Sequence, residues 1–153
     1  MDMAEAVDVF NQYLRQKKLK LTKQRSLITE TFFDPNYISE HPTVEELYVR
    51  VKARDATVGH ATIYRTLKLL VEAGLAVPNR IGQDLTRYEP EMGEHHDHMM
   101  CRRCGLIIEF EDEEIEKLQV KIAQNLGFNL FDHSMNLIVE PTTPCSYPHC
   151  SEP

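Results

Sequence analysis

The segment 94–105, EHHDHMMCRRCG, brings three histidines and an aspartate close to a Cys-x-x-Cys pair. If the chain is extended here, successive side chains point to opposite faces, so His96 and His98 share one face. By the same rule His95 and Asp97 share the other face. Imidazole nitrogens and carboxylate oxygens bind Fe(II), Mn(II), Co(II) and Zn(II) without selecting strongly among them. The spacing therefore predicts two nitrogen and oxygen metal sites, back to back across a strand.

Each of these two sites needs further ligands from elsewhere in the chain. The remaining candidate histidines are His41, His60 and His133, and acidic residues are in surplus. Spacing alone does not choose among them, so the pattern leaves the completing ligands open.

The four cysteines form a separate, sulfur-rich set. Cys101 and Cys104 are spaced as a knuckle in which two thiolates bind one ion, and Cys145 and Cys150 offer a second pair. Tetrahedral coordination by four thiolates favours zinc with no open position, which predicts a structural zinc that ties the C-terminal segment to the rest of its domain. The alternative is two unrelated pairs of buried or reactive thiols.

Length and composition favour a globular protein of the cytoplasm. The 153 residues suit one domain or two small ones, and 42% hydrophobic residues are enough to build cores. No apolar run approaches the roughly 20 residues of a membrane span, and the first ten residues carry acids where a signal peptide has bases. We therefore expect a cytoplasmic protein without a membrane segment, whose cysteines bind metal rather than form disulfides.

Charge is distributed unevenly along the chain. The net charge of -7 argues at first against a nucleic-acid partner. However, residues 1–90 hold 13 basic and 12 acidic side chains, whereas residues 91–153 hold 4 and 12. The run RQKKLKLTKQR, at residues 15–25, contains six bases and no acid. Such a run is most often a solvated surface, and it indicates DNA binding only if a reading element lies nearby.

Residues 1–90 have the pattern of a winged helix-turn-helix domain. Apolar spacing predicts four helices, the second capped by Thr22, the third by Thr43 in a capping box with Glu46, and the fourth at residues 60–73. Two strand-like runs, LAVPNRI and LTRYE, predict a hairpin that turns at residues 82–84. In this arrangement the last helix enters the major groove, and Tyr64 and Arg65 lie on its polar side. A small helical core with an ordinary charged surface is the alternative.

Residues 91–153 have the pattern of a small α+β domain. Strand-like runs at residues 95–101 and 106–110 precede a helix with apolar residues at 115, 118, 122 and 126, and the strand-like SMNLIVE follows. About sixty residues are few for an independent core, so we expect metal binding, dimerisation or both to stabilise this domain.

Several segments together resemble one known family. GHATIYRTLKLLVEAGL, RYE, HHDHMMCRRCG, IIEF and the distal C-x4-C are similar, in order and approximate spacing, to the ferric uptake regulator family of metal-dependent transcriptional repressors. The resemblance runs from LKLTKQR to Cys150. It implies an α+β protein with an N-terminal winged helix-turn-helix domain, a C-terminal α/β dimerisation domain with structural zinc, and a homodimer on double-stranded DNA with an inverted repeat.

The resemblance also implies site residues at the matching positions. The expected regulatory site comprises His41, Glu89, His96 and His98. The expected second site comprises His95, Asp97, Glu116 and His133, and the expected zinc ligands are the four cysteines. The implied DNA contacts are Tyr64 and Arg65 on the recognition helix, Lys20 in the minor groove or on the backbone, and Arg25 on a phosphate.

The subtype follows from one position. Peroxide-sensing relatives typically place aspartate where this chain has Glu89, so glutamate favours an Fe(II)-responsive repressor of iron-uptake genes. Peroxide-, zinc- and manganese-sensing members share much of the scaffold, and Mn(II), Co(II) or Zn(II) can replace Fe(II) in such a site. Two other classes are less favoured. A metalloenzyme would use an open coordination position to activate water, but no dedicated nucleophile or substrate pocket is recognisable. A metal-buffering protein without operator affinity would leave Tyr64 and Arg65 unexplained, so we expect a regulator and not an enzyme.

Overall fold

A computed structural model of the protein describes residues 3–37, 40–80, 85–91 and 95–142. The chain divides into two compact units, Met1–Gly93 and Glu94–Pro153. Among the described residues, no helix is both long and apolar enough to cross a membrane.

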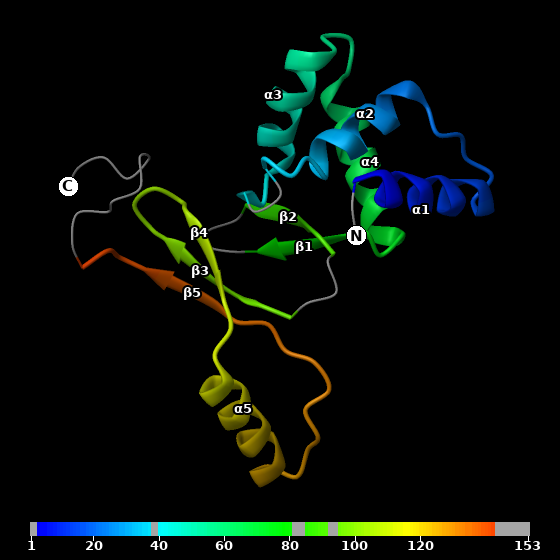
Figure 1. Ribbon diagram of the computed structural model, residues 1–153. Helices are drawn as coiled ribbons and strands as arrows, with labels where there is room; N and C mark the ends of the chain where they lie inside the picture. Colours follow the sequence, from blue (N-terminus) through cyan, green and yellow to red (C-terminus); the bar gives the residue numbers. More distant parts are fainter. Residues whose placement is uncertain (1–2, 38–39, 81–84, 92–94, 143–153) are drawn as a thin grey trace. The chain divides into compact units, whose positions relative to one another are not determined.

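Helices make up most of the first unit (Figure 1). They are α1 (Met3–Gln16), α2 (Lys23–Phe32), α3 (Val44–Arg54) and α4 (His60–Glu72). The Thr22 side chain caps α2 by accepting a hydrogen bond from the Arg25 N–H at 3.2 Å. Thr43 and Glu46 form a reciprocal capping box at the start of α3. Both predicted caps are confirmed, and each satisfies backbone N–H groups that the helix itself leaves unpaired.

The apolar stripes of these helices meet in one core. The largest fully buried apolar side chains are Phe10, Leu14, Ile28, Phe32, Phe33, Leu47, Val51, Ile63, Leu67 and Leu70. Burying a side chain of this size contributes roughly 1.5–3 kcal/mol each. The three predicted inward residues of α4, Ile63, Leu67 and Leu70, are confirmed as fully buried. Packing on this side fixes which face of α4 points to solvent.

A two-stranded hairpin completes the first unit. Strand β1 (Ala76–Arg80) pairs antiparallel with β2 (Thr86–Pro90). Gly74 has a φ of +69°, so it ends α4 in the left-handed conformation and turns the chain into β1. The predicted turn at residues 82–84 lies outside the described residues. Helices followed by this hairpin are the predicted winged helix-turn-helix arrangement.

The second unit contains a three-stranded sheet in the order β4-β3-β5. Central β3 (Asp97–Cys101) pairs antiparallel with β4 (Ile107–Phe110) and parallel with β5 (Asn136–Val139). The sequence predicted a strand from residue 95, which is wrong by two residues. Phe110, the last residue of β4, pairs with Asp97, so the ladder between these two strands ends there.

Helix α5 (Glu113–Asn125) connects β4 to β5 and projects away from the sheet (Figure 1). Asp112 caps it by accepting hydrogen bonds from two backbone N–H groups. None of its residues is buried, and Leu118, Ile122 and the following Leu126 are 56%, 50% and 70% exposed. The predicted apolar face exists, and the described residues of this chain leave it largely exposed. An exposed apolar helix face of this kind is typical of an interaction surface.

Candidate metal centres and nucleic-acid interface

The first unit presents a buried histidine–glutamate pair. His41 precedes α3, is 1% exposed, and has its Nε2 2.8 Å from Oε2 of Glu89 in β2. The strand hairpin brings Glu89 to the loop because the backbone N–H of Tyr88 donates to the Pro42 carbonyl at 3.0 Å. One imidazole nitrogen and one carboxylate oxygen of the expected regulatory set are therefore adjacent within the first unit.

The second unit holds the two other residues of that expected set. The rings of His96 and His98 lie with centroids 5.0 Å apart at an angle of 76°. His96 Nε2 is 3.7 Å from Oε1 of Glu109, and Glu109 pairs with His98 in the β3–β4 ladder. Donor atoms of these three residues lie within 4.8 Å of one another. Sequence reasoning missed Glu109, although its place in the short strand IIEF, antiparallel to the histidine strand, was a usable signal.

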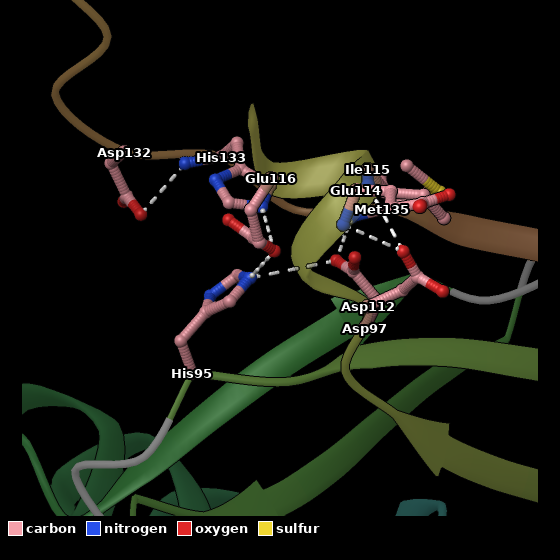
Figure 2. A network of polar contacts seen from close by, with 9 residues as sticks. All are labelled: His95, Asp97, Asp112, Glu114, Ile115, Glu116, Asp132, His133 and Met135. Carbon is pink, nitrogen blue, oxygen red and sulfur yellow. Dashed lines mark hydrogen bonds and ion pairs between the residues drawn. The ribbon is translucent and has the colours of Figure 1, made fainter. Parts of the chain in front are cut away.

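The four residues of the expected second set come together within the second unit (Figure 2). Glu116 of α5 lies between two histidines, with its Oε1 3.4 Å from His95 Nε2 and 3.2 Å from His133 Nε2. His95 Nε2 also lies 3.7 Å from Oδ1 of Asp97. One ligand atom from each of the four residues fits within a span of 4.8 Å. This spacing and this mixture of nitrogen and oxygen donors suit a divalent transition-metal ion.

The environment of Asp97 shows whether the second set can hold a cation. Its side chain is 1% exposed, and Oδ1 accepts a hydrogen bond from the Met135 N–H at 3.0 Å. Oδ2 is buried and has no hydrogen-bond partner among the described residues. A buried carboxylate oxygen without a partner is costly, and a bound cation satisfies it. The residues therefore fit a metal ion.

Two of the four predicted zinc ligands lie at the end of β3. Cys101 is buried and Cys104 is partly exposed. A tight turn joins them, in which the Gly105 N–H donates to the Cys101 carbonyl at 2.8 Å and Gly105 has a φ of +73°. Cys145 and Cys150 lie outside the described residues. The four-thiolate site therefore stays a prediction.

The outward face of α4 carries the predicted DNA-reading residues. Tyr64 is 47% exposed and Arg65 is exposed, on the side opposite the buried Ile63 and Leu67. The Lys68 ammonium lies 5.9 Å from the centre of the Tyr64 ring. One aromatic and two basic side chains therefore share an exposed helix face, an arrangement that suits the major groove.

The other predicted DNA contacts lie at the start of α2. Arg25 donates from Nη1 to the carbonyl of Lys20 at 2.6 Å, and Lys20 is exposed. His60, which the sequence left as a candidate metal ligand, instead pairs with Glu45 at 3.0 Å and contacts the Tyr48 ring. The structure thus places His60 at the start of α4, outside both ligand groups found among the described residues.

Comparison with known proteins identifies the family. The sequence model described as the Ferric uptake regulator family matches residues 16–138. The ferric uptake regulation protein of Campylobacter jejuni is 44% identical over 130 residues, which cover 84% of this chain and 81% of that protein.

Solved structures agree with the sequence match. The Helicobacter pylori ferric uptake regulator, described as having three functional metal-binding sites, matches with a TM-score of 0.84 and 26% identity over 93% of each chain. The Francisella tularensis ferric uptake regulator, solved with iron, matches with a TM-score of 0.73 and 31% identity, covering 81% of this chain and 92% of the other. With its winged helix-turn-helix, its paired histidine and carboxylate sets and this degree of identity, the chain belongs to the ferric uptake regulator family.

Proposed function

We propose that this protein is a metal-dependent, DNA-binding transcriptional repressor that responds to Fe(II) and controls genes for iron uptake. Residues 1–90 bind DNA, and residues 91–153 dimerise and bind metal. The observation that carries the proposal is the buried pair of His41 and Glu89 in the same unit as the exposed recognition helix. A DNA-reading unit that presents metal-ligand side chains is suited to respond to metal.

On the operator, α4 enters the major groove. Tyr64 and Arg65 contact base edges or phosphates, while Lys20 and Arg25 contact the backbone or minor groove. Residues 1–90 have a net charge of +1, so binding depends on this local basic surface rather than on the protein's overall charge. Affinity for the operator should fall with salt, with a log-log slope of about -0.9 for each phosphate neutralised.

The regulatory ligands come from both units. His41 and Glu89 supply one part of the set, and His96 and His98 supply the other. Glu109 is an additional oxygen donor beside His96. When bound, a divalent ion supplies the positive charge and coordination bonds that hold these side chains together. If metal binds the arrangement in which all these side chains share one ion a hundredfold more tightly than any other, it stabilises that arrangement by roughly 2.7 kcal/mol. This is enough to change operator occupancy.

The second set and the cysteines have different roles. The second set draws on three parts of the second unit: His95 and Asp97 at the start of β3, Glu116 in α5, and His133 in the segment before β5. A shared ion would cross-link these parts. The four cysteines hold a structural zinc that joins the distal Cys145 and Cys150 to the knuckle at the end of β3.

The functional form is a homodimer in the cytoplasm. The exposed apolar face of α5 supports this proposal, because a second copy of the chain would cover it. Two recognition helices related by a twofold axis match a DNA inverted repeat. Dimerisation therefore links the second unit to the choice of operator.

Iron is the proposed regulatory metal because the chain has glutamate at position 89, where peroxide-sensing members of the family typically have aspartate. Peroxide-, zinc- and manganese-sensing regulators are the alternatives within the family. They predict the same DNA-binding fold but a different activating metal or signal.

The proposal is tested by DNA binding to the protein's own promoter region at controlled free-metal concentrations. We expect tight binding with Fe(II), or with Mn(II) as its air-stable substitute, and weak binding after metal removal. His96→Ala should abolish the metal response together with tight binding. Equal affinity of metal-free and metal-loaded protein would refute the metal switch, and binding that does not weaken with salt would refute DNA as the partner.

A further inference from the structure

His41 has an unusual backbone conformation. Its φ is +46°, in the left-handed region that residues with side chains seldom adopt. It also precedes Pro42, and a residue before proline prefers extended backbone. Such a conformation persists only where surrounding contacts hold it. The contacts that hold His41 therefore control where its imidazole lies.

Arg87 makes the contact to the His41 backbone. Its Nη1 donates to the His41 carbonyl at 3.0 Å and to Oε2 of Glu46 at 3.0 Å. The Arg87 side chain is 15% exposed and its bond to the His41 carbonyl is partly buried, whereas the Glu46 side chain is 46% exposed. Glu46 Oε2 also accepts from the Thr43 N–H at 2.8 Å, as part of the α3 capping box. The Arg87 guanidinium thus links the His41 backbone to the capped N-terminus of α3.

The same strand holds His41 at two points. Arg87 and Glu89 are two residues apart in β2, so they lie on one face of the strand. Arg87 binds the His41 carbonyl and Glu89 binds its ring nitrogen, at 3.0 and 2.8 Å. Strand β2 therefore contacts both the backbone and the side chain of His41.

We propose that Arg87 is a positioning residue for the regulatory metal site: it keeps His41 in the left-handed conformation that presents the imidazole beside Glu89. The inference rests on the proposed function of His41 as a metal ligand. Without Arg87, His41 samples other backbone conformations. The apparent metal affinity then falls in proportion to the fraction of molecules in which the imidazole still lies beside Glu89. Removal of a residue that orients a metal ligand typically weakens metal binding by about 10–100-fold.

The test compares Co(II) titrations of the full-length protein, followed by visible absorption, for the wild type and three variants. His41→Ala identifies the absorption change that belongs to the regulatory site. Arg87→Met should raise the Co(II) dissociation constant of that transition by about 10–100-fold, and Arg87→Lys should give an intermediate value. Lysine keeps the charge but lacks the planar fork that reaches two acceptors.

Arg54→Met is the matched control. Arg54 donates to Thr31 Oγ1 at 2.8 Å and lies 3.6 Å from a Glu30 carboxylate oxygen, so it also joins two partners within the first unit. Urea unfolding of each metal-free protein measures general stability. A positioning role predicts that both arginine variants lose some stability but only the change at position 87 weakens Co(II) binding.

The outcomes separate this inference from the proposed function. If His41→Ala weakens Co(II) binding but Arg87→Met does not, Arg87 has no positioning role and the ligand assignment stands. An equal loss of Co(II) affinity in Arg54→Met also overturns the inference, because general destabilisation then explains it. If His41→Ala leaves Co(II) binding unchanged, the proposed regulatory site itself is wrong. Should Arg87→Met fail to unfold cooperatively, the Co(II) dissociation constant of Arg87→Lys decides in the same way.

Discussion

The substitution Asp97→Asn separates a structural hydrogen bond from a metal-binding charge. Asp97 Oδ1 accepts from the Met135 N–H at 3.0 Å, which ties the segment before β5 to the start of β3. Asparagine has a similar shape and keeps a carbonyl oxygen for this bond. It replaces the other, buried carboxylate oxygen with an NH2 group, which carries no negative charge and does not bind cations. The variant should therefore fold normally but lose the second metal site.

The expected magnitudes differ with and without metal. In metal-free protein the retained hydrogen bond limits the change in free energy of unfolding to about 1 kcal/mol. A metal that binds only the folded state at one hundred times its dissociation constant stabilises it by about 2.7 kcal/mol per site. Wild-type protein should gain this amount from each of the two sites formed by histidines and carboxylates. Asp97→Asn should lack the contribution of one site.

The assay is urea unfolding at a fixed protein concentration, with Mn(II) and after metal removal. Asp132→Asn is the matched control, because Asp132 is exposed, accepts a hydrogen bond from the neighbouring His133 N–H at 2.9 Å, and lies outside the four-residue set. We expect the control to keep the full stabilisation by Mn(II). If Asp97→Asn gains as much from Mn(II) as the wild type, the second set does not bind metal and the reasoning from the buried oxygen fails.

Four further predictions follow from other parts of the chain. Ile122→Glu places a charge on the exposed apolar face of α5 and should convert a dimer to monomers in sedimentation experiments; an unchanged dimer would rule this face out as the interface. Arg65→Ala should weaken operator binding by about 1–3 kcal/mol if Arg65 reads a base, measured by fluorescence anisotropy, with little effect on metal binding. Leu67→Ala removes a fully buried side chain and should lower the free energy of unfolding by about 2–5 kcal/mol in urea titrations. Hydrogen bonds from the side chain and then the backbone of Thr57 lower the pKa of Asp55. This pair therefore stabilises the fold above the ordinary pKa of 3.8, and the contribution is lost as pH falls through the lowered value. Thr57→Val should raise the Asp55 pKa in an NMR titration and remove part of that acid dependence.

Much of the first unit follows from local sequence. Thr22 and the box of Thr43 with Glu46 are caps that act within one helical turn, so residue spacing predicts them directly. The inward residues of α4 follow from helical periodicity for the same reason. The start of β3 was predicted two residues too early, because the end of a strand depends on where its neighbour ends, and that neighbour is β4.

The metal sites show where local reasoning stops. Strand alternation separated His96 and His98 from His95 and Asp97 without any knowledge of the fold. It did not identify Glu109, whose position beside His96 depends on the pairing of β3 with β4. The other partners of the histidines came from the family resemblance rather than from spacing.

The sequence by itself determined the helices, their caps, the family and the residue types available for metal and DNA, because each of these depends on neighbouring residues or on matching motifs. Only the tertiary structure decided which distant groups meet. Arg87 and the His41 carbonyl are 46 positions apart, and Glu116 and His133 are 17 apart, so no periodicity relates them. Tertiary structure also decided that the described part of a single chain leaves the apolar face of α5 exposed. Periodicity shows that a helix has an apolar face, whereas packing determines what covers it.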